Sequence, residues 1–204
     1  MSMQHYILHT SRDAQLYERI SLPQQSESTV LITAQAGSHV CLLIESHASC
    51  NGSLTIELNL HEHATVLIAV CVRVSGSDNF QIKSTQFHML PHGTSRVWVR
   101  KIVSDKATAT YHGFVHVAPE AMGTVVSQDD KTLLDGLHAR AESTPVLEVL
   151  TNDVSCAHGS ALGSVDPLMV WYMQTRGITV HDARTMLYDA FFDDVCQMLL
   201  QKGL

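Results

Sequence analysis

Short runs in which apolar and polar residues alternate fill the chain from about residue 28 to residue 128. In the run from Leu54 to Leu60, leucine and isoleucine alternate with threonine, glutamate and asparagine. Successive side chains of a strand point to opposite faces, so this run predicts a strand with one buried face. Other β-branched or aromatic runs, bounded by Gly, Asn, Asp or Ser, lie at residues 30–34, 40–45, 65–74, 80–87, 96–103 and 111–117.

The connections between these runs are too short to hold the helices that βαβ crossovers need, so the pattern predicts an all-β region. Two architectures compete. A sandwich or barrel would use hairpins, which favour two-residue loops such as Asn-Gly or Asp-Gly, and only Asn51–Gly52 fits. A solenoid needs recurring short turns and aliphatic residues in register, which the spacing permits. The pattern alone leaves both architectures open.

A different pattern begins after residue 163. Asp166 is a helix N-cap followed by proline at the first helical position, and Gly177 ends the helix predicted there. Thr179 then caps a second predicted helix. Its apolar residues recur at steps of three and four, which predicts one buried stripe made of Ala183, Met186, Leu187, Ala190, Phe191, Val195, Met198 and Leu199.

We therefore expect two parts, a β core over residues 1–163 and a helical region over residues 164–204. Composition adds exclusions. A net charge of −7 argues against broad binding to nucleic acid or anionic membrane, and no basic patch marks the helices as DNA-reading. No apolar run is long enough to span a membrane. The N-terminus lacks the features of a secretion signal, so we expect a cytoplasmic protein.

The cysteines form no CxxC pair and no regular framework. Their odd number, without a secretion signal, predicts reduced thiols rather than disulfides. Four of the five match no motif and are expected to serve packing: Cys41, Cys50, Cys71 and Cys196.

Among thirteen histidines, His61 and His63 are the closest pair. Alternate residues of a strand share a face, so the pair could join in a metal site, but Glu62 would point to the other face. Because a third ligand is missing, we favour a polar, solvent-facing pair at a turn.

The segment from Gln128 to Leu187 carries a series of motifs whose order and spacing resemble those of the SufB/SufD family of iron–sulfur cluster assembly scaffolds. The chain is closer to the SufD branch, because Cys156-x-His158 is followed by glycine where the SufB branch has glutamate. The matching stretches are residues 128–134, 139–141, 145–148, 152–159, 163–166, 172–178 and 183–187.

This resemblance implies a right-handed parallel β-helix, a single-stranded solenoid, followed by a C-terminal two-helix hairpin. It also implies a non-catalytic scaffold subunit in a complex with a SufB-type subunit and the ATPase SufC. In such complexes the β-helix ends of the scaffold subunits pair, and the C-terminal helices contact the ATPase. The chain resembles a family member shortened at the N-terminus, which leaves pairing with SufB or with a second copy open.

Cys156 and His158 are the candidate ligands of a transient iron–sulfur cluster. Thiolate and imidazole both ligate iron, and on a strand the two residues would point the same way, about 6.5–7 Å apart. Two ligands cannot close a site, so the others would come from a partner subunit or solvent. Each residue also has a plainer interpretation, Cys156 as a small buried hydrophobe and His158 as a turn residue before Gly159.

The exposed edge of the second helix and the turn between the helices are the candidate partner contacts, where Arg176 could also cap the first helix. Two other functions compete with the scaffold. A degenerate interaction module would keep partner binding without cluster chemistry. A pectin-cleaving enzyme would need clustered catalytic side chains that these coils lack, so we expect no enzyme. The contact candidates are Arg176, Gly177, Asp182, Arg184 and Asp189.

Overall fold

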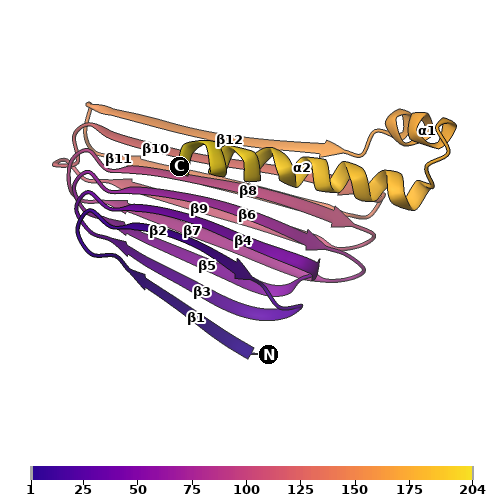
Figure 1. Ribbon diagram of the computed structural model, residues 1–204, viewed down its shortest axis with the longest axis horizontal. Helices are drawn as coiled ribbons and strands as arrows, with labels where there is room; N and C mark the ends of the chain where they lie inside the picture. The colour runs from indigo at the N-terminus through magenta and orange to yellow at the C-terminus, as the bar shows by residue number, and fades with distance from the viewer. Residues whose placement is uncertain (1, 204) are drawn as a thin grey trace.

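A computed structural model describes residues 2–203, which form twelve strands in two sheets followed by two helices (Figure 1). One sheet holds the odd-numbered strands β1 (Ser2–His9), β3 (Gln25–Ala34), β5 (Asn51–Leu60), β7 (Asn79–His88), β9 (Thr108–Val117) and β11 (Arg140–Val149). The other holds β2 (Gln15–Ser21), β4 (His39–Ser49), β6 (Thr65–Val74), β8 (Thr94–Ser104), β10 (Thr124–Asp135) and β12 (Val154–Ser164). The helices are α1 (Pro167–Thr175) and α2 (Val180–Gly203).

Successive strands alternate between the two sheets, and every neighbouring pair within a sheet runs parallel. Each coil therefore contributes one strand to each sheet, and the chain is a parallel β-solenoid. The predicted parallel solenoid is confirmed and the hairpin alternative is excluded. Asn51–Gly52, the one hairpin-like pair, opens β5, which pairs in parallel with β3 and β7.

Side chains that point between the sheets stack in columns from coil to coil. One column runs Leu42, Ile68, Val97, Gln128 and His158, from β4 to β12. The aliphatic members of the early coils are fully buried and form the main hydrophobic core. The column shows that the interior changes from aliphatic to polar toward the last coils.

A buried group of polar side chains lies between β7 and β8. His88 is fully buried, and its Nε2 lies 2.7 Å from the Ser95 hydroxyl, which donates to Gln86 Oε1 at 2.6 Å. Burial disfavours the imidazolium and lowers the pKa of His88 to about 4. His88 is therefore neutral in the folded protein at neutral pH.

Acid should destabilise the protein through His88. Its pKa is about 4 in the folded chain and about 6.5 unfolded, so the unfolded state takes up the proton first. The stabilisation is complete above pH 6.5 and is lost as pH falls toward 4, about 3 kcal/mol in all. We expect urea unfolding of His88→Gln to show a correspondingly weaker pH dependence over this window. The exposed His138, changed to Gln, is the matched control, and parallel curves for His88→Gln and wild type would contradict the prediction.

In the first five coils, the turn from the odd-numbered to the even-numbered sheet adopts left-handed backbone at a corresponding position. His63 and His92 occupy this position in two successive coils, and their rings stack with centroids 4.8 Å apart. His61 and His63 lie in the turn between β5 and β6, which agrees with the polar turn pair favoured from the sequence. The left-handed residues of this ladder are Asp13, Gly37, His63, His92 and Gly123.

Both helices begin at the predicted caps. The Leu168 amide donates to Asp166 Oδ1 at 2.8 Å, and the Asp182 amide donates to Thr179 Oγ1 at 3.1 Å. Gly177 has a φ of +83°, which suits glycine, in the turn between the helices. Among the described residues, neither helix has the length and apolar content that a bilayer crossing needs.

Helix α2 lies across the outer face of the even-numbered sheet, whereas α1 projects beyond the end of β12 (Figure 1). Val195 and Leu199 are buried against the sheet, as the predicted stripe requires. Phe192 and Cys196 also pack there, although the predicted stripe omits both, and its member Met186 is exposed. The buried face of α2 is thus rotated from the predicted one, because the sheet surface decides which residues are covered.

Candidate functional site at the last coil

The last coil leaves a free backbone edge on each sheet. Strand β11 pairs only with β9, and β12 pairs only with β10, among the residues that the structure describes. A free edge presents unpaired N–H and C=O groups to which another strand can add. Pro145 lacks a backbone N–H and so removes one hydrogen-bond donor from β11, whereas β12 contains no proline. The β12 edge is therefore the better template for pairing.

Cys156 and His158 both lie on β12 and extend inward-facing columns of the solenoid. Cys156 follows Val126, is half-buried and packs against the small cluster that contains Val115 and Val117. His158 follows Gln128 and is exposed. The structure thus places the two predicted ligands on one face at the open end of the interior. They share this face because they are two residues apart on one strand, and the pairing of β12 with β10 turns that face inward.

Burial raises the pKa of the Cys156 thiol, so a metal bound there would have to displace a proton. No group of three or more His, Cys, Asp or Glu side chains that could hold a metal occurs in the described part of the chain. Cys156 and His158 are suitable ligand types for iron but supply at most two positions. An iron–sulfur cargo would need further ligands from outside this chain.

Gln128 lies directly under His158 and was not singled out as a site residue. It is fully buried, and neither atom of its side-chain amide has a hydrogen-bond partner among the described residues. Buried polar groups without a partner are rare and call for bound water or a ligand. A side chain on Gly113 would collide with this amide, so the glycine keeps the space open. The unbroken polar run at residues 127–132, within a strand, is the sequence signal for this polar interior, because every second residue of a strand faces inward.

A buried ion pair lies next to Gln128. Lys101 Nζ is 2.9 Å from Asp130 Oδ2, and both side chains are almost fully buried. Burial lowers the pKa of Lys101 and raises that of Asp130, while the attraction between the two charges opposes both shifts. The ammonium also lies 5.7 Å from the centre of the Tyr111 ring. The interior of the last coils is therefore charged as well as polar.

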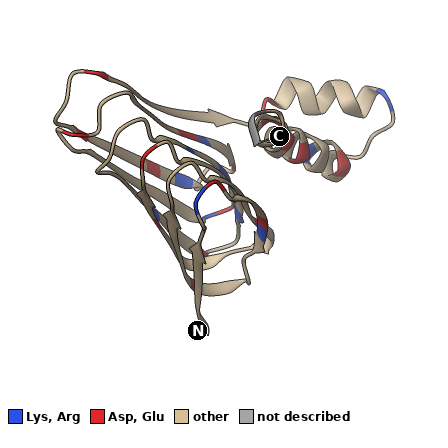
Figure 2. Ribbon diagram, turned by 60° about the vertical axis from the view of Figure 1, so that its left-hand side comes forward, with Lys and Arg blue, Asp and Glu red and all other residues tan. Residues whose placement is uncertain are grey.

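The predicted partner contacts fall into two groups. Asp189 lies 2.6 Å from Arg73, and Arg184 lies 3.3 Å from Asp135, so both hold α2 to the solenoid. Asp182 pairs with the cap residue Thr179 at the start of α2. These contacts are internal to the chain, and Figure 2 shows the acidic residues along α2.

The second group lies at the turn between the helices. The Arg176 guanidinium donates to the Tyr172 hydroxyl at 3.2 Å and lies 5.4 Å from the centre of its ring. Gly177 forms the turn itself. Both residues therefore border α1 rather than the sheet.

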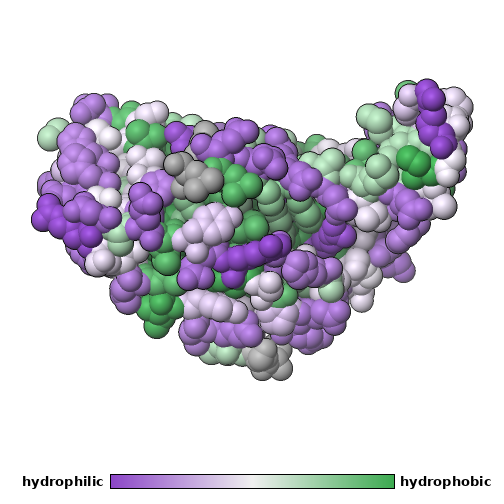
Figure 3. All heavy atoms as spheres, viewed as in Figure 1, coloured by the Kyte–Doolittle hydropathy of each residue, from purple (hydrophilic) through white to green (hydrophobic). Residues whose placement is uncertain are grey.

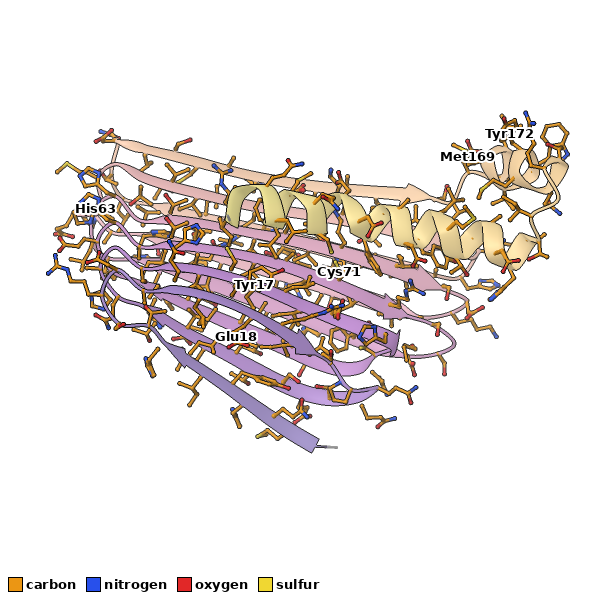
Figure 4. All side chains as sticks on the ribbon, viewed as in Figure 1. Tyr17, Glu18, His63, Cys71, Met169 and Tyr172 are labelled. Atoms are coloured by element: carbon orange, nitrogen blue, oxygen red, sulfur yellow. The ribbon has the colours of Figure 1, made fainter. Side chains whose placement is uncertain are left out.

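Helix α1 exposes an apolar surface that the sequence analysis did not identify. Leu168, Met169, Trp171 and Tyr172 are 67%, 48%, 59% and 51% exposed, and we call these four residues the α1 surface. Only Val170 of this helix is buried, and residues 167–175 carry no charge. Figure 3 shows apolar atoms on α1, and Figure 4 places Tyr172 on its outer side. A helix that is apolar on several faces is typical of a segment that another surface covers.

An apolar groove continues the α1 surface toward the solenoid. Its volume is about 330 Å³, and it lies between the two helices and the end of β10. Met169 belongs both to the groove and to the α1 surface. The lining residues include Leu133, Val165, Met169, Leu187, Ala190 and Phe191.

Residues 55–191 match the family described as "SUF system FeS cluster assembly, SufBD core domain". The chain is 36% identical over 110 residues to the iron–sulfur cluster assembly protein SufD of Escherichia coli, which covers 54% of this chain and 26% of that protein. It is 30% identical over 109 residues to a SufBD family protein of Synechocystis, and the match covers 53% of this chain and 24% of that protein. It is 25% identical over 122 residues to SufD of Bacillus subtilis, and the match covers 60% of this chain and 26% of that protein. The chain thus spans about a quarter of the length of these relatives.

Proposed function

Because this chain belongs to the SufB/SufD family of iron–sulfur cluster assembly proteins, we propose that it is a non-catalytic scaffold subunit on which clusters are assembled. The observation that carries the proposal is the free edge of β12, which bears Cys156 and His158 side by side. Both ligand types suit iron, and both lie where another chain can reach them.

The β12 edge would pair with a SufB-type subunit or with a second copy of this chain. Strand addition at a sheet edge gives affinity through backbone hydrogen bonds. It would also bring the partner's side chains next to Cys156 and His158, and so complete a site that this chain leaves with two ligands. The cluster is cargo that leaves the site, which suits a shared and partly solvated position.

The α1 surface would receive a SufC-type ATPase. Exposed Trp and Tyr are enriched among residues that dominate protein interfaces, and Arg176 and Gly177 border the surface. Asp182, Arg184 and Asp189 would meet the partner at the margin of this surface. Arg184 and Asp189 would do so in addition to holding α2 to the solenoid. We place the complex in the cytoplasm.

A second candidate is an interaction module that keeps partner binding without cluster chemistry. The raised pKa of the Cys156 thiol and its hydrophobic packing favour this alternative for Cys156 in particular. The two functions share the pairing edge and the α1 surface, and they differ only in whether His158 and Cys156 hold iron.

Anaerobic reconstitution with iron and sulfide separates the two functions. The chain, alone and with a SufB-type subunit, is loaded, and bound iron and sulfide are measured per chain. We expect His158→Ala to lose most of the bound cluster and Cys156→Ser to lose part of it. Ser155→Ala, on the opposite face of β12, is the matched control and should load normally. Equal loading of all variants would remove the ligand role and favour the interaction module.

A further inference from the structure

A solvent-connected cavity of about 520 Å³ lies between α2 and the outer face of the even-numbered sheet. Two of the five thiols, Cys71 of β6 and Cys196 of α2, line it. Figure 4 shows Cys71 on the part of the sheet that α2 covers. Charged side chains of both signs also line the cavity, where Arg19 is paired with Glu45 and Arg73 with Asp189. Cluster assembly, as proposed above, uses neither cysteine.

Cys196 packs against the hydrophobic cluster that contains Cys71, although one residue belongs to a strand and the other to a helix far along the chain. Cys71 is 3% exposed, whereas Cys196 is half-buried and opens toward the cavity. Interaction with the Cys71 thiol lowers the pKa of Cys196, although burial and the carboxylates of Asp193 and Glu45 oppose this shift. The same interaction, together with burial, raises the pKa of Cys71. An accessible thiol with a lowered pKa beside a shielded partner is the arrangement typical of an attacking and a resolving cysteine.

We propose that Cys71 and Cys196 form a redox-active dithiol whose disulfide fastens α2 to the sheet. The oxidant is a low-molecular-mass disulfide, which the cavity is large enough to admit. The Cys196 thiolate attacks one sulfur of this disulfide, forms a mixed disulfide and releases one small thiolate. Cys71 then gives up its proton and attacks the Cys196 sulfur, which releases the second small thiol. The protein loses two electrons and two protons, and the small disulfide is reduced to two thiols.

The other cysteine on this sheet face cannot replace Cys196 as the partner of Cys71. Cys41 lies opposite Leu67 of β6, four residues before Cys71. At about 3.3 Å per residue, the offset along the strand is about 13 Å, beyond the roughly 7 Å between Cα atoms that a disulfide spans. Cys41 also does not line the cavity. It is therefore a matched control on the same face of the sheet.

The disulfide would fix α2, the helix against which α1 packs. Helix α2 is otherwise held by the packing of Phe192, Val195 and Leu199 and by surface ion pairs, all of them reversible contacts. Oxidation would thus lock the position of α2 on the even-numbered sheet, and reduction would release it.

The test treats the purified, reduced chain with oxidised glutathione and maps the products by non-reducing peptide mass spectrometry. We expect one cross-linked peptide joining Cys71 to Cys196, an upward shift of the thermal unfolding midpoint, and reversal of both by dithiothreitol. Cys71→Ser should lose the cross-link and accumulate glutathione on residue 196, because the resolving thiol is absent. Cys196→Ser should lose both products, and Cys41→Ser should behave as wild type.

The absence of a Cys71–Cys196 cross-link in the wild-type chain would overturn the proposal. So would a mixed disulfide that forms on Cys41 or Cys50 as readily as on Cys196. If Cys71→Ser does not fold, Cys71→Ala keeps the buried site apolar and serves the same purpose. Circular dichroism of each variant before oxidation confirms that the solenoid is intact.

Discussion

Replacing Lys101 with methionine is expected to lower the free energy of unfolding by about 3–5 kcal/mol, because Asp130 would keep its charge in the interior without a partner. Both side chains are shielded from water between the sheets, so neither charge can be solvated when the other is removed. Chemical denaturation at pH 7 measures the loss.

The double variant Lys101→Met/Asp130→Leu should recover most of this loss, because it removes both charges and keeps the volume filled. In the single variant the pKa of Asp130 in the folded state lies above its unfolded value. Protonation then favours the folded state, so the single variant should lose stability as pH rises through that folded pKa. Lys106→Met, at an exposed turn, is the control and should change the free energy by less than about 0.5 kcal/mol. A single variant as stable as this control would show that the pair is not a buried interaction.

Changing Trp171 to alanine is expected to weaken the complex with a SufC-type ATPase by about 30-fold or more, which corresponds to about 2 kcal/mol. The indole is 59% exposed in the free chain, so it has apolar area left to bury against a partner. For the same reason its removal should hardly change the free energy of unfolding. Calorimetric titration of wild type and variant with the purified ATPase gives the two dissociation constants.

Leu137→Ala is the matched control for this experiment. Leu137 is 99% exposed between β10 and β11, so it tests the loss of an exposed apolar side chain elsewhere. An unchanged dissociation constant for Trp171→Ala, or equal losses in both variants, would contradict a docking role for the α1 surface. Deleting the chain after Gly163 is a poorer test, because it would also uncover Leu67 and Trp98 on the sheet.

Local sequence pattern determined most elements of the fold. Runs of β-branched and aromatic residues identified seven of the strands. Several of these runs also alternate, as a strand between core and solvent does. Asp166 and Thr179 marked both helix starts, because capping is a local interaction. The choice between hairpins and a solenoid depended on the resemblance to a family. Strand pairing joins residues about one coil apart, and a local pattern does not encode it.

The candidate site was likewise predicted only in part from the sequence. The sequence identified Cys156 and His158, and strand alternation placed them on one face. It did not predict that α1 stays uncovered, nor that Arg184 and Asp189 bind within the chain. The apolar run of β6, buried on both faces, was a signal that something covers the outer face of the sheet. The run itself did not show that α2 is the element that covers it.

By itself, the sequence determined the repeated strands, the capped helices and the chemical type of the candidate ligands, because each depends on residues close together in the chain. Only the tertiary structure decided which strand edge stays free, which face of α2 is buried and which thiols meet across the cavity. Contacts of this kind bring Lys101 to Asp130 from one coil to the next, and Cys196 of α2 to Cys71 of the sheet. The physical reason is that packing fixes such contacts only after the coils have stacked and α2 has found its place on the sheet.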